Sequence, residues 1–273
     1  MFDTTCDDDP RRPIRRPLVA SLPLALMAAA WPYTAALAQA GQGGTAGSNG
    51  PLSANLPTPG SQRFRVYYGD VSRNVQVAEI DYRLAHDADA YQIDTRGNAV
   101  GMVAMFYSGV LIQNSIGRIG KNGLLPEKYS ERRGKRPERV VRFDQAGRKM
   151  IGLGDPPEVA LLPGTQDRLS VFYQVGLLAR SRPAMFQTGQ RFNLPLASMK
   201  EIDIPDFLVA GAEAVQTARG SLPALRLTVR NPADSGDPTI DVWLGSTITM
   251  LPARIRVQDP DGKVIDQVLV PPA

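Results

Sequence analysis

Residues 63–84 read RFRVYYGDVSRNVQVAEIDYRL, and apolar side chains recur along this stretch at every second position. The series comprises Phe64, Val66 and Tyr68, then Val75 and Val77, then Ile80, Tyr82 and Leu84. A period of two with aromatic and β-branched residues predicts strands. Between Val77 and Ile80 the spacing changes from two to three, which moves side chains to the other face unless a bulge or bend intervenes. The stretch therefore predicts a curved sheet.

The alternation continues towards the C-terminus, interrupted by turn sequences rich in Gly, Asp and Pro. Further strands are expected at 91–96, 110–116, 126–133, 138–143, 148–153, 190–199, 200–204, 213–217, 224–229 and 239–244, and around Ile255 and Val268. Turns are expected at 86–89, 120–123, 134–137, 144–147 and 259–262. Many short strands separated by turns predict antiparallel pairing.

Two segments depart from this alternation. Residues 101–107 are almost uniformly apolar and predict a buried helical turn or short helix. A longer helix is expected to begin at Thr165 or Asp167, either of which could cap it, and to end before Pro183. The predicted fold is mainly β with a minor α+β component: a curved antiparallel sheet or partly closed β-barrel with one packed helix. We expect residues 63–273 to form this fold as a single β-rich domain.

The N-terminal segment has the order of a signal peptide, because four arginines between residues 11 and 16 precede an uncharged apolar stretch. Residues 1–38 are expected to be this signal peptide, with cleavage after Ala38 or Ala40. The alternative is an uncleaved anchor, since the apolar run approaches the ~20 residues that span a bilayer. Residues 39–62, rich in Gly, Ser, Pro and Ala, predict a flexible linker. The mature protein is therefore expected in the periplasm, with membrane contact only through the signal segment before cleavage.

The sequence lacks the residues that several kinds of catalytic site require. Cys6 precedes the apolar run, so the mature chain has one histidine and no cysteine, and cannot supply the usual ligands of a zinc site. His86 lies beside a predicted turn, where an exposed histidine is favoured over a Ser-His-Asp triad. Asp81 and Asp94 fall on adjacent predicted strands and leave carboxylate-dependent hydrolysis open, although most strand carboxylates face water. The sequence therefore predicts no catalytic, cofactor-binding or metal-binding residues, and no cofactor is expected. The ligand-binding residues stay unknown.

Positive charge is concentrated between Arg118 and Lys149, where eleven Lys or Arg residues stand against four Asp or Glu. This basic sector could face anionic lipid, lipopolysaccharide or acidic glycan. Nucleic acid is not expected as a partner of an exported protein. The alternative is a hairpin whose charges simply face water.

Apolar residues offer another functional reading, because a curved sheet closed by a helix can enclose a cavity. The side chains considered for its lining are Met102, Met105, Phe106, Phe172 and Trp243. Flexible Met side chains suit variable ligands. The alternative for each of these residues is that it fills the core, so none is assigned to a site.

The order of four segments is similar to a known family. These segments are Tyr67-Tyr68-Gly69, the apolar turn at 101–107, LPGTQDRLS at 162–170, and LPARIR at 251–256 before Asp261-Gly262. Together they resemble the bacterial family named domain of unknown function 3108, over about residues 63–270. The resemblance implies an exported, mostly β protein, and by fold analogy a periplasmic lipoprotein carrier; it implies no catalytic residues.

These observations favour a non-enzymatic periplasmic protein that binds an apolar or amphiphilic component of the cell envelope, such as a lipid. Two alternatives stay open: a carboxylate-dependent hydrolase of envelope glycans, and a structural assembly factor that uses the basic sector as a contact surface. Whether the protein is an enzyme is uncertain, although a binding role is favoured. The oligomeric state is unknown.

Overall fold

The structure is a computed structural model that describes residues 51–70, 72, 75–106, 109–230 and 238–271. The predicted signal peptide at 1–38 and residues 39–50 of the predicted linker lie outside the described residues. Among the described residues, no helix combines the length and apolar character needed to cross a membrane.

Fourteen antiparallel strands form one sheet, which we divide into two halves that meet where β1 pairs with β16. The N-terminal half contains β1 (Gly60–Tyr68), β2 (Gln76–His86), β3 (Ala90–Ala99), β4 (Val110–Gly120), β5 (Gly123–Arg133), β6 (Arg139–Asp144), β7 (Lys149–Ile151) and β8 (Glu158–Ala160). The C-terminal half contains β9 (Arg191–Asn193), β12 (Asp206–Thr217), β13 (Gly220–Arg230), β14 (Thr239–Gly245), β15 (Leu251–Gln258) and β16 (Val264–Val270). The sheet runs from β8 at one edge to β9 at the other and is not closed.

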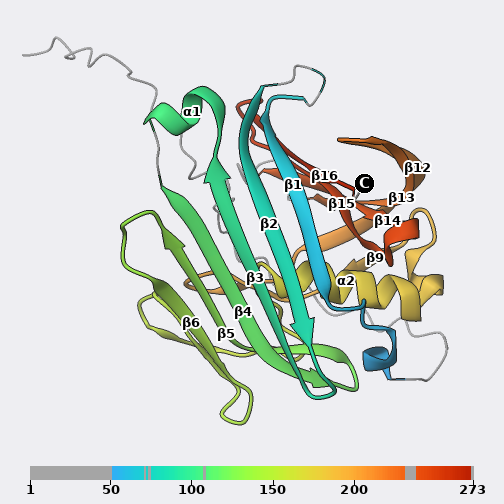
Figure 1. Cartoon of the computed structure of the whole chain (residues 1–273). Helices are drawn as coiled ribbons and strands as arrows, with labels where there is room; N and C mark the ends of the chain where they lie inside the picture. Colours follow the sequence, from blue (N-terminus) through green and yellow to red (C-terminus); the bar gives the residue numbers. More distant parts are fainter. Residues whose placement is uncertain (1–50, 71, 73–74, 107–108, 231–237, 272–273) are drawn as a thin grey trace, which may run out of the picture.

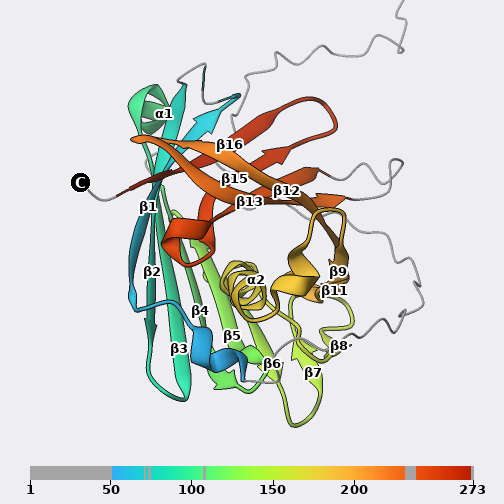
Figure 2. The same cartoon turned by 90° about the vertical axis from the view of Figure 1, so that its right-hand side faces the viewer.

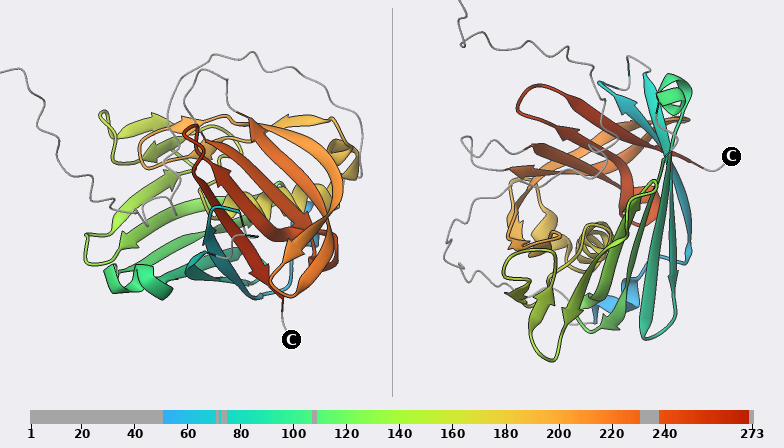
Figure 3. Two further views of the ribbon diagram at one scale, coloured as in Figure 1. Left: turned by 90° about the horizontal axis from the view of Figure 1, so that it is seen from above. Right: turned by 90° about the vertical axis from the view of Figure 1, so that its left-hand side faces the viewer.

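Helices and a small second sheet complete the described part of the chain. The helices are α1 (Gly101–Phe106) and α2 (Ser170–Ser181), with 3-10 helices η2 (Leu52–Asn55), η4 (Pro183–Phe186) and η5 (Ser246–Ile248). The second sheet pairs β10 (Leu196–Ala197) with β11 (Ile202–Asp203). The large sheet curls around α2, which is seen nearly end-on at the centre of Figure 2. Seen from above, the C-terminal half lies over this helix (Figure 3, left). The prediction of a mainly β, curved antiparallel sheet with one packed helix is confirmed.

A β-bulge produces the predicted change of face in β2. Val66 pairs with Ala78 whereas Tyr67 pairs with Gln76, so Val77 is an extra residue on its strand. An extra residue bends the strand and increases its local twist. Similar shifts occur in the pairings of β4 with β5, β12 with β13 and β14 with β15. The curvature of the sheet is therefore distributed over several bulges.

Helix α2 begins where Asp167 and Ser170 cap each other. The Asp167 carboxylate accepts the backbone N–H groups of Leu169 at 2.8 Å and Ser170 at 2.9 Å, while Ser170 Oγ accepts the Asp167 N–H at 2.9 Å. Such reciprocal bonds satisfy amides that lack partners at a helix start. Asp167 is thus the cap, and the regular helix starts three residues after it. Ten of the twelve helix residues are buried, which fits a helix enclosed by the sheet.

The predicted burial of the 101–107 segment is wrong. Helix α1 forms at Gly101–Phe106, but the side chains of Met102 and Met105 are 77% and 81% exposed. The helix directly follows β3 at the rim of the sheet (Figure 1), and only Val103 packs against a core cluster among its residues whose burial is described. A six-residue helix at the rim of a sheet has no second layer to cover its other face.

The predicted linker ends earlier than expected. Leu52 in η2 is buried and belongs to the core cluster that contains α2 residues. Asn55 Nδ2 donates to Ser181 Oγ at 2.8 Å, and Arg180 Nη1 donates to Asn55 O. Residues 51–62 therefore contribute η2 and the start of β1 to the domain, because Leu52 and Leu56 supply apolar surface to bury.

Candidate ligand-binding cavity

A cavity of about 100 Å³ lies between α2 and the inner face of the C-terminal half. One side is an apolar wall from alternate positions of β13, β14 and β15: Leu227, Val229, Ile240, Val242, Leu244, Ile255 and Val257. The helix side is supplied mainly by Val171, Phe172 and Val175. The wall follows from the period of two, since Ile240, Val242 and Leu244 point inwards together. The cavity is therefore an unfilled part of the main hydrophobic core.

The N-terminal half presents a polar row to the same interior. Tyr82, Thr95, Gln113 and Glu131 are successive partners across β2, β3, β4 and β5. Thr95 Oγ1 donates to Gln113 Oε1 at 3.1 Å, and Gln113 Nε2 donates to the Tyr129 hydroxyl at 2.7 Å. Tyr82 and Gln113 reach the cavity lining, whereas Thr95 and Glu131 do not. One side of the cavity is thus apolar and the other is partly polar.

Glu131 is a buried carboxylate whose charge is balanced from the rim of the sheet. Its Oε1 accepts from Arg133 at 3.3 Å and from Arg139 at 3.2 Å, and its Oε2 accepts from the Tyr129 hydroxyl at 3.3 Å. Burial, helped by the negative charge of Glu131, raises the pKa of Tyr129 well above its ordinary value. Tyr129 therefore stays a neutral hydrogen-bonding group between Gln113 and Glu131.

Asp167, the cap of α2, is a second buried carboxylate. Ser115 Oγ donates to its Oδ2 at 2.5 Å, and Tyr91 lies 3.1 Å from the same hydroxyl. Burial raises the pKa of Asp167, although the hydrogen bonds from Ser115 and from the helix amides oppose this effect. Both carboxylate oxygens are occupied, and the side chain does not line the cavity.

Arg168 follows Asp167 and does line the cavity. It is half-buried, and its guanidinium has no hydrogen bond or ion pair with any residue that the structure describes. Gln267 lies in the same lining and accepts a hydrogen bond from the Tyr82 hydroxyl at 3.3 Å. Arg168, Gln113, Gln267 and Tyr82 are the polar members of a lining that is otherwise apolar.

Of the five side chains considered for a cavity lining, Phe172 alone is in it. Met102 and Met105 are exposed on α1, and the side chain of Phe106 lies outside the described residues. Trp243 is buried but points to the outer face, because it alternates with Val242 and Leu244. The residues of the apolar wall alternate with a period of two in the sequence, but this period does not show which face of a strand borders a cavity. Arg168 stands within the QDRLS segment that carried the resemblance.

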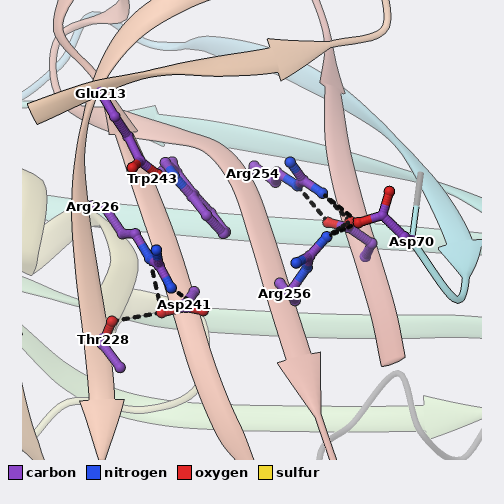
Figure 4. Close-up of polar contacts among 9 residues, drawn as sticks. Asp70, Glu213, Arg226, Thr228, Asp241, Trp243, Arg254 and Arg256 are labelled. Carbon is purple, nitrogen blue, oxygen red and sulfur yellow. Dashed lines mark hydrogen bonds and ion pairs between the residues drawn. The ribbon is translucent and has the colours of Figure 1, made fainter. Parts of the chain in front are cut away.

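Trp243 is held in a polar cluster on the outer face (Figure 4). The guanidinium carbons of Arg226 and Arg254 lie 5.2 and 5.1 Å from its ring centroid, within the range of cation–π attraction. Its Nε1 donates to Glu213, and Val215 packs in the same cluster. The tip of the β12–β13 hairpin therefore bends back over the outer face.

Two aspartates neutralise the arginines of this outer cluster. Arg226 and Thr228 donate to Asp241 (Figure 4). Both Arg254 and Arg256 donate to Asp266, which is fully buried. A further carboxylate, Asp70, bonds Arg256. The pKa of Asp70 is lowered to about 2, mainly because its carboxylate accepts a hydrogen bond from the backbone amide of Ser72. Each charge in the cluster has a partner, which fits a role in holding β13–β16 together.

The two carboxylates considered for hydrolysis lie on the outer face of the N-terminal half. Asp81 is opposite Arg96 and bonds Arg63 at 2.7 Å. Asp94 accepts from Asn114 at 2.7 Å and Gln92 at 2.8 Å. The strand register makes Asp81 and Asp94 diagonal neighbours. Neither residue lines the cavity, so the structure brings them together on an open surface and not in a cleft.

His86 ends β2 beside a turn, as predicted. Its Nε2 lies 2.9 Å from the carbonyl oxygen of Pro57, and its Nδ1 lies 3.2 Å from that of Asp87. The described residues contain no group of three His, Cys, Asp or Glu side chains placed to hold a metal ion.

The basic sector forms the hairpins of β4 to β7, as its turn sequences predicted. Part of its charge is neutralised within the domain, because Arg133 and Arg139 bind Glu131. Arg118 pairs with Glu127 and Lys149 pairs with Glu158, both at 3.0 Å. The sector is therefore less of a free cationic surface than its composition indicates.

The chain is similar to two solved structures at low identity. One is a beta-barrel-like protein of domain of unknown function DUF1849 from Brucella abortus, with 13% identity and a TM-score of 0.48, covering 79% of this chain and 97% of that chain. The other is the hypothetical protein CT021 from Chlamydia trachomatis, with 9% identity and a TM-score of 0.32, covering 80% of this chain and 89% of that chain. No curated protein matches the chain.

The resemblance noted in the sequence is confirmed by a family model. The model for proteins of unknown function named DUF3108 matches residues 63–268, which include β2–β15, most of β1 and β16, and the cavity. The chain therefore belongs to the DUF3108 family.

Proposed function

We propose that this protein is exported to the periplasm and binds an apolar or amphiphilic component of the cell envelope in the cavity beside α2. The observation that carries the proposal is an unfilled cavity with an apolar wall inside a core that is otherwise packed. Protein interiors leave few voids larger than a water molecule, and apolar cavities stay dry and accept apolar guests. An empty space of this kind lowers stability, so a ligand that fills it would recover packing energy.

The size of the cavity limits the ligand. An engineered apolar cavity of ~150 Å³ binds benzene, and the volume here is about 100 Å³. A single hydrocarbon chain segment or a small ring fits this space better than a lipid with two bulky chains. The cavity is partly open, so the remainder of a longer ligand can extend beyond it.

Hydrolysis of glycans is not favoured by the positions of the carboxylates. The buried carboxylates Glu131 and Asp167 are occupied by internal partners and do not line the cavity. Asp81 and Asp94 bond to neighbouring side chains on the outer face. A glycosidase needs two carboxylates that flank a substrate, and these four do not form such a pair around the cavity.

The test is native mass spectrometry of protein purified from the periplasm, followed by lipid extraction of any ligand that copurifies. Val242→Phe should fill the cavity and abolish retention of the ligand, with a modest gain in stability of about 1 kcal/mol from filling the void. The matched control is Val75→Phe, because Val75 is 49% exposed and outside the cavity. The control should retain the ligand. Equal retention by Val242→Phe and the wild type would contradict the assignment of the cavity.

Export is tested separately by the intact mass of the periplasmic protein. The expected mass is that of a chain starting after Ala38 or after Ala40. Recovery of the uncleaved chain in the membrane fraction would show an anchored protein instead.

A further inference from the structure

Arg168 is the one charged side chain that lines the cavity among the residues described. It extends from the start of α2 into a lining shared with Gln113, Gln267 and Tyr82. The opposite side is the apolar wall. The cavity therefore has the polarity of an amphiphile, with one cationic end and one hydrocarbon side.

Arg168 differs from the arginines that balance the buried carboxylates of this domain, because it lines the cavity and has no described acceptor. The buried carboxylate of Glu131 binds two arginines, and that of Asp266 binds Arg254 and Arg256. Taking charge away from water is costly unless the charge is paired and hydrogen-bonded. A half-buried guanidinium with no described acceptor can therefore bind an anionic ligand without first breaking an internal ion pair.

Neighbouring acidic groups do not supply that anion. Asp167 directs its oxygens to Ser115 and to the amides of Leu169 and Ser170. Glu131 is bonded to Arg133 and Arg139 at the rim of the sheet. Each carboxylate is committed elsewhere, so Arg168 stays available to a ligand.

We propose that Arg168 binds the anionic headgroup of a single-chain amphiphile whose hydrocarbon chain lies along the apolar wall. This assignment rests on the proposed function and adds the chemical class of the ligand. A guanidinium presents a planar fork that matches the oxygens of a carboxylate or a phosphate. A neutral hydroxyl offers this fork only one uncharged acceptor, and a cationic headgroup offers none. The amide of Gln267 lies in the same lining and offers a second polar contact.

The experiment compares four ligands that share one chain: octanoate, octyl phosphate, 1-octanol and octyltrimethylammonium. Their affinities for the mature protein, stripped of copurifying lipid, are measured by calorimetry. The two anions should bind at least about tenfold more tightly than the alcohol, which corresponds to one charge-assisted hydrogen bond of ~1.5 kcal/mol. The cationic ligand should bind most weakly. A preference between the two anions identifies the source, either a free fatty acid or a phosphate-bearing lipid.

Arg168→Met should remove the preference for anions and leave the affinity for 1-octanol unchanged, because the methionine keeps an apolar stem of similar length. Arg168→Lys should retain part of the preference. The matched control is Arg219→Met, at the exposed tip of the β12–β13 hairpin, which makes the same change in net charge and should bind all four ligands as the wild type does. If the methionine variant does not fold, Arg168→Gln provides the same comparison with a polar side chain.

Two outcomes would overturn the headgroup assignment: the wild type binds 1-octanol as tightly as octanoate, or the preference for anions survives in Arg168→Met. A different outcome rejects the proposed function itself. In that case none of the four ligands binds the wild type, or Val242→Phe binds them all without loss.

Discussion

Helix α2 meets the two halves of the sheet in different ways. Gln174 accepts the Leu124 N–H and donates to the Asn122 carbonyl, both at 2.9 Å, which ties the helix to the turn between β4 and β5. Ser115 of the same half bonds the helix cap Asp167. Towards the C-terminal half the helix presents Val171, Phe172 and Val175 across the cavity. Directional bonds fix the helix on one side, while apolar packing on the other side leaves room for a guest.

The largest expected effect comes from enlarging the apolar side. Leu227→Ala should lower the free energy of unfolding by about 3 kcal/mol, because the lost side chain extends an existing void. Leu177→Ala, at an equally buried position in the cluster of the N-terminal half, is the matched control. Urea unfolding should show a loss in both variants. Octanoate should stabilise both, because each keeps the cavity, but it should recover more of the loss in Leu227→Ala, whose void is continuous with the cavity. Equal recovery of the two variants by octanoate would contradict a guest site confined to one side of the helix.

A smaller effect is expected from removing a charge on the polar side. Glu131→Gln should cost about 2 kcal/mol, less than the ~3–5 kcal/mol for breaking a fully buried pair, because Arg133 and Arg139 are 20% and 43% exposed and can reach water. Glu127→Gln on the same strand is the control, since its pair with Arg118 is exposed and should contribute under about 1 kcal/mol. Chemical denaturation measures both. Equal costs would show that the interior of the N-terminal half does not depend on buried charge.

The smallest effect concerns Asp167 and depends on pH. Its folded pKa is raised above the ordinary value of 3.8, so the native state holds the proton to higher pH than the unfolded state does. The stability of the wild type relative to Asp167→Asn should therefore be greatest below about pH 4 and fall as pH rises towards the raised pKa. Asparagine retains the capping oxygen, so the change in free energy should be near 1 kcal/mol or less. A relative stability that increases with pH across this window would show that hydrogen bonds outweigh burial.

The sequence was most informative where one local rule determines the structure. Alternation located the strands, the change of spacing after Val77 marked a real bulge, and Asp167 was one of two predicted caps. It was least informative where a second layer determines the outcome. Trp243 and Val242 are adjacent and both buried, yet only Val242 borders the cavity, because the curl of the sheet assigns the inner face. Met102 is apolar but exposed, since α1 has no layer above it.

The open sheet also has consequences for behaviour at high concentration. Its outermost strands, β8 at Glu158–Ala160 and β9 at Arg191–Asn193, are each three residues long. An incoming strand from another molecule therefore finds only a short template of free backbone groups at the β8 border. At the other border β9 pairs only with Asp206–Leu208 of the twelve-residue β12, so strand addition is expected there before it occurs at β8.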